Sequence, residues 1–204
     1  MAYGFLDIAI TPTVKAVQTE MGADALWSDF KGHREFDQFT DAEQAFIATR
    51  DSFYMASVSE TGWPYVQHRG GPRGFLKVLD ERTLAFADYR GNRQYISTGN
   101  FVGNDRACLI LMDYPSRSRL KIYAHVKKLG PDEDSDLARI VTDSIYKGRL
   151  ERVFRLELAS FDWNCQQHIT PRFTEAEIVA AIDPLRRRLA ELEAENAVLR
   201  RRTG

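Results

Sequence analysis

The chain has 204 residues, enough for one domain with appendages and a substantial hydrophobic core. Its 28 Lys and Arg residues nearly balance 29 Asp and Glu residues, so the overall charge of -1 favours neither nucleic acid nor an anionic membrane as a partner. No apolar run approaches the ~18 residues of a membrane span, and the two cysteines, Cys108 and Cys165, follow no charged-then-apolar leader. We therefore expect a cytoplasmic protein with free thiols.

Residues 1–50 predict helices, which we expect to form an N-terminal segment packing on the rest of the fold. Thr11 before Pro12 is typical of a helix start, with the threonine as N-cap and the proline in the first turn. Thr40 and Glu43 form a capping box, in which each side chain can accept a hydrogen bond from the other residue's backbone N–H. A second helix is therefore expected directly after Thr40.

From Ser52 the pattern changes to short strands joined by turns. A first hairpin is predicted by SFYMASVS, the turn ETGWP and YVQHR, and a second by GFLKVL, DERT and LAFAD. Neighbouring strands are predicted by RACLILMD and RLKIYAHVKK, followed by a helix in DSDLARIVTDSIYKG and a late strand in RVFRLELASFDWN. Because short strands with hairpin turns outnumber helices, we predict a mainly β (α+β) fold for residues 51–173, an antiparallel barrel with peripheral helices.

Residues 174–204 carry a heptad pattern, in which apolar side chains recur at alternating spacings of four and three. The positions are Ile178, Ile182, Leu185, Leu189, Leu192, Asn196 and Leu199. With Leu192 at position d, Asn196 falls at position a, where a lone asparagine sets the register of parallel dimers. The pattern predicts a C-terminal helix that either pairs between subunits as a coiled coil or packs on its own barrel.

Charged residues support the helix but do not decide between these alternatives. Arg188 would face Glu193 of a parallel partner, and Glu195 would face Arg200, both pairs of opposite sign. The dipeptide 183–184, Asp-Pro, predicts that the helix restarts there, with the aspartate as the cap.

The segment ADYRGNRQYISTGN, residues 87–100, follows an apolar strand and precedes a predicted helix. The strand ends at Asp88, Gly91 permits an unusual backbone, Asn92 is a good N-cap, and Arg93 falls in the first turn. A helix start carrying an arginine is suited to a phosphate, because free backbone N–H groups, the helix dipole and the guanidinium act together. The alternative is an ordinary solvated turn.

Two further segments concentrate polar side chains. VQHRGGPRGFLKV places Gln67, His68, Arg69 and Lys77 around a Gly-Gly-Pro break, either as the polar face of an edge strand with a bend or as the lining of a cleft. FDWNCQQHITPRF holds Trp163, Gln167, His168 and Arg172; its aromatic and amide groups could stack on and hydrogen-bond a planar heterocycle, or simply close the barrel.

In this order the three segments resemble the FMN-binding split β-barrel proteins related to pyridoxamine 5'-phosphate oxidase, over residues 45 to 173. The resemblance implies an antiparallel split barrel and a homodimer with FMN at the subunit interface. It also implies roles for single residues. The turn 91–94, Gly-Asn-Arg-Gln, stands where the family has a Gly-Ser-Arg-Lys turn that holds the FMN phosphate.

Arg93 thus matches the family's phosphate-binding arginine directly, whereas Gln94 replaces the lysine and weakens that contact. Further FMN-binding positions are implied at Asn92, at Ala87 and Asp88 on the strand end, at Lys77, and at Trp163 and Arg172. The family's strand arginine falls on Pro72 here, which leaves Arg69 or Arg73 as its substitute. Gln67, His68 and Gln167 are added as cofactor-binding candidates because they are polar side chains of the same segments, and Trp163, Gln167 and Arg172 could come from the other subunit. No metal site is indicated.

The resemblance implies an FMN-dependent oxidoreductase whose substrate stays open, with NAD(P)H or a small heterocyclic compound as the reaction partner. The chain lacks the Arg-Leu-His-Asp-Arg signature of the vitamin B6 enzymes, which argues against pyridoxamine phosphate oxidase activity itself. The alternatives are a non-enzymatic flavin-binding or sensing protein and a protein that binds deazaflavin F420 or haem. His68 and His168 are the only candidates for acid–base catalysis, and each is more simply a hydrogen-bonding residue, so the catalytic residues stay unassigned.

Overall fold

The computed structural model describes residues 4–23, 38–163 and 166–203, so Cys165 lies outside the described residues. The chain divides into two compact units. The first comprises residues 1–113 and 118–166, and the second comprises residues 114–117 and 167–204. In the part of the chain described, no helix is both long and apolar enough to cross a membrane.

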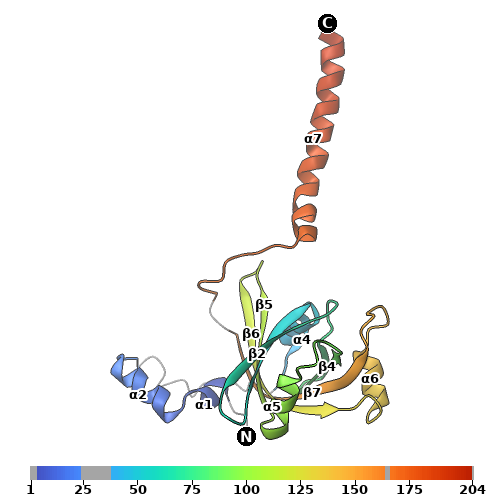
Figure 1. The fold of residues 1–204 in the computed structure, drawn as a ribbon. Coiled ribbons are helices and arrows are strands. Elements are labelled where there is room, and N and C mark those ends of the chain that lie inside the picture. Colours follow the sequence, from blue (N-terminus) through green and yellow to red (C-terminus); the bar gives the residue numbers. More distant parts are fainter. Residues whose placement is uncertain (1–3, 24–37, 164–165, 204) are drawn as a thin grey trace. The chain divides into compact units, whose positions relative to one another are not determined.

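The first unit is built on a seven-stranded antiparallel sheet (Figure 1). Its strands are β1 (Ser52–Val58), β2 (Pro64–Gly70), β3 (Lys77–Asp80), β4 (Thr83–Tyr89), β5 (Arg106–Asp113), β6 (Ser118–Leu129) and β7 (Leu150–Trp163). The strand order is β2-β1-β5-β6-β7-β4-β3, so β2 and β3 are the two edges. The edge residue Arg69 nevertheless contacts Asp88 of β4, which means that the sheet curls on itself without closing its hydrogen-bonded ring. The prediction of an antiparallel split barrel with peripheral helices is confirmed.

Alternating side chains of these strands fill the barrel. On the paired strands β5 and β6, Leu109 lies opposite Ile122 and Leu111 opposite Leu120, and all four are fully buried. Aromatic rings complete the centre, which is why the strands carry so many phenylalanines: Phe53, Phe86 and Phe154 are each at most 1% exposed. Burial of each such side chain stabilises the fold by about 1.5–3 kcal/mol.

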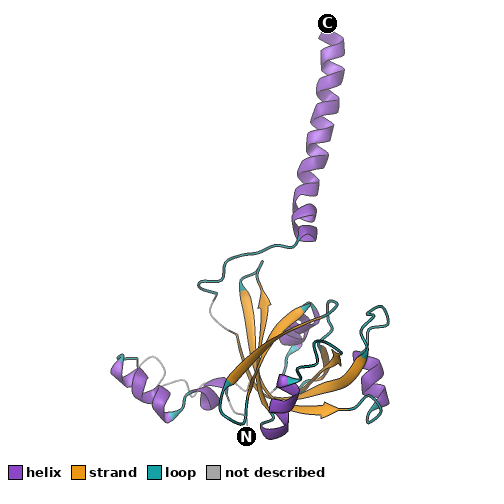
Figure 2. Cartoon of the chain, in the orientation of Figure 1, coloured by secondary structure: helices purple, strands orange, loops and turns teal. Residues whose placement is uncertain are grey.

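Short helices accompany the sheet, and most of them pack on its strands (Figure 2). They are α1 (Phe5–Ala9), α2 (Pro12–Glu20), α4 (Asp41–Ala48), α5 (Ile96–Gly103) and α6 (Ser135–Val141). The helix starts predicted at Thr11 and at the capping box of Thr40 and Glu43 are both confirmed, and the Thr40 N–H donates to Glu43 Oε2 at 2.9 Å. From α1, the ring of Phe5 stacks on Tyr123 of β6, with 4.5 Å between the ring centroids.

At the Gly-Gly-Pro break between β2 and β3, the backbone lies very close to the Phe75 side chain. A Cβ at Gly71 would lie 2.8 Å from the Phe75 ring, so only glycine fits there. Gly74 follows with a φ of +76°, a left-handed conformation that glycine adopts readily. The resulting loop places Phe75 against Phe53, with 5.4 Å between the ring centroids, and so attaches the edge of the sheet to the core.

The second unit is dominated by α7 (Glu175–Thr203), a helix of 29 residues. The predicted restart at residues 183–184 is wrong, because Pro184 lies inside this helix and Asp183 forms an ion pair with Arg187 at 2.6 Å. The helix begins instead after Thr174, whose N–H donates to Glu177 Oε2 at 2.8 Å, while the Glu177 N–H donates to Thr174 Oγ1 at 3.3 Å. This capping box satisfies the first backbone donors one turn or more before the proline, and α7 tolerates the one hydrogen bond that the proline removes.

Candidate functional site

A polar cavity of about 200 Å³ lies in the first unit where β2, the end of β4, the start of β7 and the start of α5 meet. Its lining residues are Tyr65, Gln67, Arg69, Asp88, Tyr89, Gly91, Asn92, Arg93, Gln94, Tyr95, Ile96, Ser97, Thr98, Glu151 and Arg152. The structure thus brings two of the sequence segments, the polar strand and the turn after β4, to one place. Six of the residues that the sequence predicts to bind the cofactor line this cavity: Gln67, Arg69, Asp88, Asn92, Arg93 and Gln94.

The carboxylate of Asp88 holds two arginines at the base of the cavity. Arg69 Nη1 donates to Asp88 Oδ1 at 2.5 Å, and Arg152 Nη1 donates to Asp88 Oδ2 at 2.8 Å. Arg152 also donates to Thr98 Oγ1 at 3.0 Å, which ties β7 to α5. The Asp88 side chain is only 7% exposed. One buried carboxylate therefore fixes two guanidinium groups and leaves the cluster with a net positive charge.

A second carboxylate, Glu151, borders the same cavity. Its Oε1 accepts hydrogen bonds from Arg90 Nε at 2.7 Å and from the Tyr95 hydroxyl at 3.2 Å, and its Oε2 pairs with Arg152 at 3.2 Å. The hydrogen bond from Arg90 is the main reason why the pKa of Glu151 lies below its ordinary value, and the same contact raises the pKa of Arg90. Glu151 thereby connects the turn after β4 to β7.

The substitution Glu151→Gln should reduce stability in a pH-dependent way. Because the folded-state pKa of Glu151 is depressed, its contribution is present above the unfolded value of about 4.3 and is lost as the pH falls through the folded pKa. Urea unfolding of both proteins between pH 7 and pH 3 should show a difference in unfolding free energy that shrinks below about pH 4.3. A difference that stays constant over this range would contradict the assignment.

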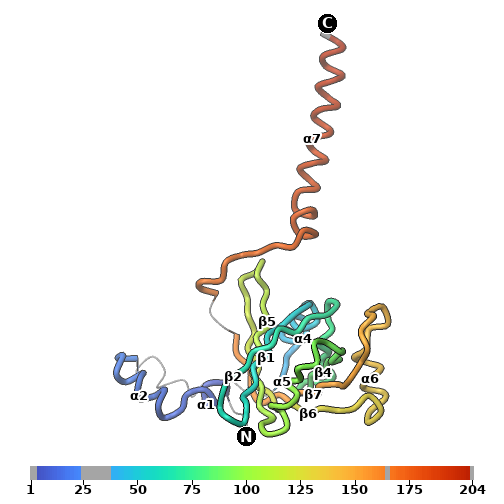
Figure 3. The backbone as a smooth tube through the Cα atoms, in the orientation of Figure 1, coloured from blue at the N-terminus to red at the C-terminus, as the bar shows by residue number. Residues whose placement is uncertain are grey.

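The turn after β4, which leads into α5 in Figure 3, has a different backbone from the one the sequence predicts. Gly91 is not among the residues with positive φ, whereas Arg93 and Tyr95 have φ values of 63° and 54°. Asn92 does not cap the helix, because its Oδ1 accepts the Gln94 N–H at 3.1 Å in a local turn. The two left-handed residues keep the chain out of helical geometry until Ile96, so the predicted N-cap at Asn92 is wrong and Tyr95 holds that position.

Two buried polar atoms in the cavity wall lack a hydrogen-bond partner among the described residues. They are the Ser97 hydroxyl, in a side chain at the start of α5 that is 3% exposed, and Arg69 Nε. A buried polar group left unpaired costs about 1–3 kcal/mol, so such atoms are expected where a ligand completes the hydrogen bonding. Both can donate, and the wall that they share with Arg93 therefore fits an anion.

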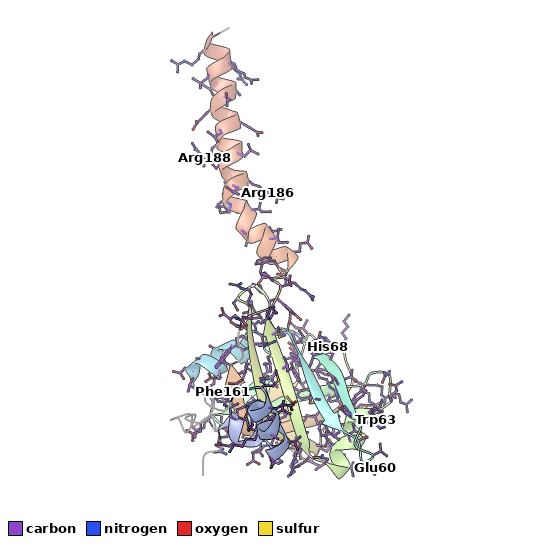
Figure 4. The ribbon with its side chains drawn as sticks, turned by 90° about the vertical axis from the view of Figure 1, so that its left-hand side faces the viewer. Glu60, Trp63, His68, Phe161, Arg186 and Arg188 are labelled. Atoms are coloured by element: carbon purple, nitrogen blue, oxygen red, sulfur yellow. The ribbon has the colours of Figure 1, made fainter. Side chains whose placement is uncertain are left out.

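Three of the predicted residues lie near the cavity in sequence but face elsewhere. His68, labelled in Figure 4, is on the opposite face of β2 from Gln67 and meets Tyr54 edge-on, with 5.4 Å between the ring centroids. The side chain of Ala87 is buried in the apolar cluster beneath α6. Lys77 is half-buried on the edge strand β3, opposite Ala85 of β4.

The late segment is divided between the two units. Trp163 ends β7, where its indole N–H donates to Glu43 Oε1 at 2.5 Å and its ring meets Phe46 edge-on at 4.8 Å. This position agrees with the structural alternative, in which the tryptophan closes the barrel. In the second unit, the Arg172 guanidinium lies 4.9 Å from the centroid of the Tyr114 ring, and Gln167 and His168 are exposed.

Several cavity residues were not identified from the sequence, chiefly Ser97, Glu151 and Arg152. Arg152 and Asp88 are register partners on the antiparallel pair β7 and β4, 64 residues apart in the chain. The charged dipeptide at the start of β7 was the available signal, but its partner depends on strand order and register, which local patterns do not give.

The comparison with a family model matches the part of the chain that contains this cavity. A family model described as pyridoxamine 5'-phosphate oxidase matches residues 39–157. No curated protein sequence matches the chain. Among solved structures, HupZ of Group A Streptococcus is 11% identical, with a TM-score of 0.51 over 66% of this chain and 99% of that chain. An FMN-binding protein from Syntrophomonas wolfei is 13% identical, with a TM-score of 0.49 over 72% of this chain and 97% of that one. The likeness to HupZ shows a shared fold.

Proposed function

Because the chain belongs to the pyridoxamine 5'-phosphate oxidase family, we propose that its cavity binds FMN and that the protein is an FMN-dependent oxidoreductase. The observation that carries the proposal is the donor set of the cavity wall. Three arginines, Arg69, Arg93 and Arg152, line the same cavity as Ser97, whose buried hydroxyl has no partner among the described residues. A phosphate ester dianion needs this combination of positive charge and fixed donors.

The start of α5 adds to the phosphate site. The first backbone N–H groups of a helix have no acceptor within the helix, and the helix dipole makes that end electropositive. Ile96, Ser97 and Thr98 form this first turn and all three line the cavity. Gln94 supplies no second cation to the turn, but Arg152 from β7 brings one to the same wall. We expect Arg152, which also pairs with Asp88 and Glu151, to stand in for the missing lysine.

The size of the cavity supports a second subunit at the site. Pockets that enclose a ligand of this size usually measure about 300–1,000 Å³, and this one measures about 200 Å³. It can hold the phosphate and part of the chain attached to it, while a flavin ring needs further walls. We propose that these come from a second copy in a homodimer, with Trp163, Gln167 and Arg172 as the contributing residues. The Trp163 indole would have to present its ring face while its N–H stays on Glu43.

Bound FMN would supply hydride or electron transfer, and the protein would bind and orient it. No histidine, lysine or cysteine occurs among the described residues of the cavity wall, and its two carboxylates, Asp88 and Glu151, are both held by arginines, so we assign no residue to acid–base or nucleophilic catalysis. Hydride transfer between NAD(P)H and the flavin needs neither a general acid or base nor a nucleophile from the protein. Since the same observation is compatible with a protein that only carries or senses flavin, that is the second candidate.

The purified protein is expected to be yellow, with flavin absorbance bands and one FMN released per chain on denaturation, identified by mass. Steady oxidation of NADH or NADPH by the loaded protein would then separate an oxidoreductase from a flavin carrier. Protein that is colourless and fails to bind added FMN, or that instead retains deazaflavin F420 or haem, would contradict the proposal.

A further inference from the structure

The helix α7 carries an apolar seam that is exposed along its length. The seam consists of Ile178, Ile182, Leu185, Leu189, Leu192 and Leu199, whose side chains are 37–70% exposed, with Asn196 in the same row. A helix of 29 residues is about 44 Å long at 1.5 Å per residue, so the seam is a long stripe and not an isolated patch. Pro184 falls at heptad position c, away from the stripe. An apolar stripe of this kind is expected to be covered by another surface.

We propose that the seam of α7 pairs with the seam of a second copy of this chain in a parallel, two-stranded coiled coil. The spacing of the seam is the four-and-three alternation that supercoiled helices require. The proposal concerns α7 alone and does not depend on the identity of any cofactor.

The charges beside the seam are complementary to a second copy. In a parallel pair, Arg188 at position g faces Glu193 of the second copy, and Glu195 faces Arg200 of the second copy. Figure 4 shows Arg188 projecting from α7 into solvent. Within one helix, Arg188 contacts Glu191 at 2.9 Å, an exposed pair worth little that can be exchanged for the contact between copies.

Charge alone does not set the direction of pairing. In an antiparallel pair with the seams aligned, Arg188 would face Glu195 of the second copy and Arg186 would face Glu193, which is equally favourable. The charges therefore select a second copy of the chain as the partner, whereas the orientation must come from the seam itself.

Asn196 distinguishes the two orientations. In the parallel pair it lies opposite Asn196 of the second copy, and the two amides can hydrogen-bond because each has both a donor and an acceptor. In the aligned antiparallel pair it lies opposite Leu185, which leaves a buried amide unpaired at a cost of about 1–3 kcal/mol per amide. The asparagine thus favours the parallel pair.

A parallel coil has a consequence for the first unit as well. It joins two chains in the same direction on a two-fold axis and keeps their barrels at a high effective concentration. Even a weak contact between the barrels would then be maintained.

Disulfide trapping in the full-length chain tests the proposal. In a background where Cys108 and Cys165 are replaced by alanine, Leu199→Cys places a thiol at position d, and Ala194→Cys places one at the outward position f. In a parallel coil the two copies of residue 199 face each other, within the Cα separation of about 4.4–6.8 Å that a disulfide requires. In the antiparallel pair they would lie about 25 Å apart.

Mild oxidation should convert the Leu199→Cys protein mainly to a disulfide-linked dimer on a non-reducing gel and leave the Ala194→Cys protein mainly as single chains. Circular dichroism should show equal helix content in both. Equal yields from both variants, or no dimer from either, would overturn the proposal, since α7 would then pair antiparallel or pack on its own chain. Adding Asn196→Leu should lower the yield at residue 199; an unchanged yield would contradict the role given to the asparagine.

Discussion

Replacing Asp88 with alanine is expected to lower the free energy of unfolding by about 3 kcal/mol, because two partly buried arginines lose their shared carboxylate. Arg69 and Arg152 approach the two oxygens of Asp88 at 2.5 and 2.8 Å, and their side chains are 19% and 17% exposed. Arg152 keeps its ion pair with Glu151, whereas Arg69 is left without the carboxylate that holds it, so the loss includes the cost of an uncompensated, largely buried charge at Arg69.

The matched control is Asp105→Ala. Asp105 also pairs with a basic side chain, His125, at 3.0 Å, but both groups are at least half exposed. Exposed pairs contribute about 0–1 kcal/mol, so this variant should unfold almost as the original protein does. Urea unfolding of cofactor-free protein measures both, because bound ligand would add its own stabilisation. Equal losses from the two substitutions would show that Asp88 is not the anchor of the cluster.

The features predicted correctly from the sequence are those that short stretches of chain determine. The capping box of Thr40 and Glu43 and the helix start at Thr11 rest on side chains within three residues of the groups they cap. Hairpins follow from strands and turns that are adjacent in the chain. The structure also brings six residues of the polar strand and of the turn after β4 to one cavity, while their role in binding FMN stays a prediction.

The errors arose where two local signals competed. Asn92 and the dipeptide at 183–184 both have helix-capping character. At Asn92 the side chain serves a turn to Gln94, and left-handed residues postpone the helix to Ile96. At residues 183–184 the earlier capping box of Thr174 and Glu177 starts the helix first. Propensity identifies a possible cap, but the cap that is used depends on the neighbouring backbone.

The charge pattern of the cavity is a property of the folded sheet. Arg69 on an edge strand and Arg152 on an inner strand reach the same carboxylate only because the sheet curls and because β4 and β7 pair in one register. A slip of one residue in that register would turn Arg152 to the opposite face and leave Asp88 with one partner. Ion pairing in the cavity and strand register therefore support each other.

Replacing Arg93 with glycine is expected to weaken FMN binding while leaving stability unchanged or slightly higher. Arg93 is exposed, and no carboxylate pairs with it in the part of the chain that the structure describes, so its removal breaks no ion pair there. Its φ of 63° is a left-handed conformation that costs a residue with a side chain about 1–2 kcal/mol and that glycine adopts freely. The greater freedom of glycine in the unfolded chain offsets part of this gain.

Loss of the guanidinium should cost about 1.5–3 kcal/mol of binding, the strength of hydrogen bonds to a charged group, which corresponds to a roughly 10- to 150-fold increase in the Kd for FMN. Quenching of flavin fluorescence during titration of the cofactor-free protein measures the Kd, and urea unfolding of the same sample measures stability.

Arg117→Gly is the matched control for this variant. Arg117 is also an exposed arginine with a left-handed backbone, φ 55°, but it belongs to the turn between β5 and β6 and does not line the cavity. It should show the same small change in stability with no change in the Kd. If both glycine variants weaken FMN binding equally, or if Arg93→Gly lowers stability as much as it lowers affinity, then Arg93 supports the turn and does not hold the phosphate.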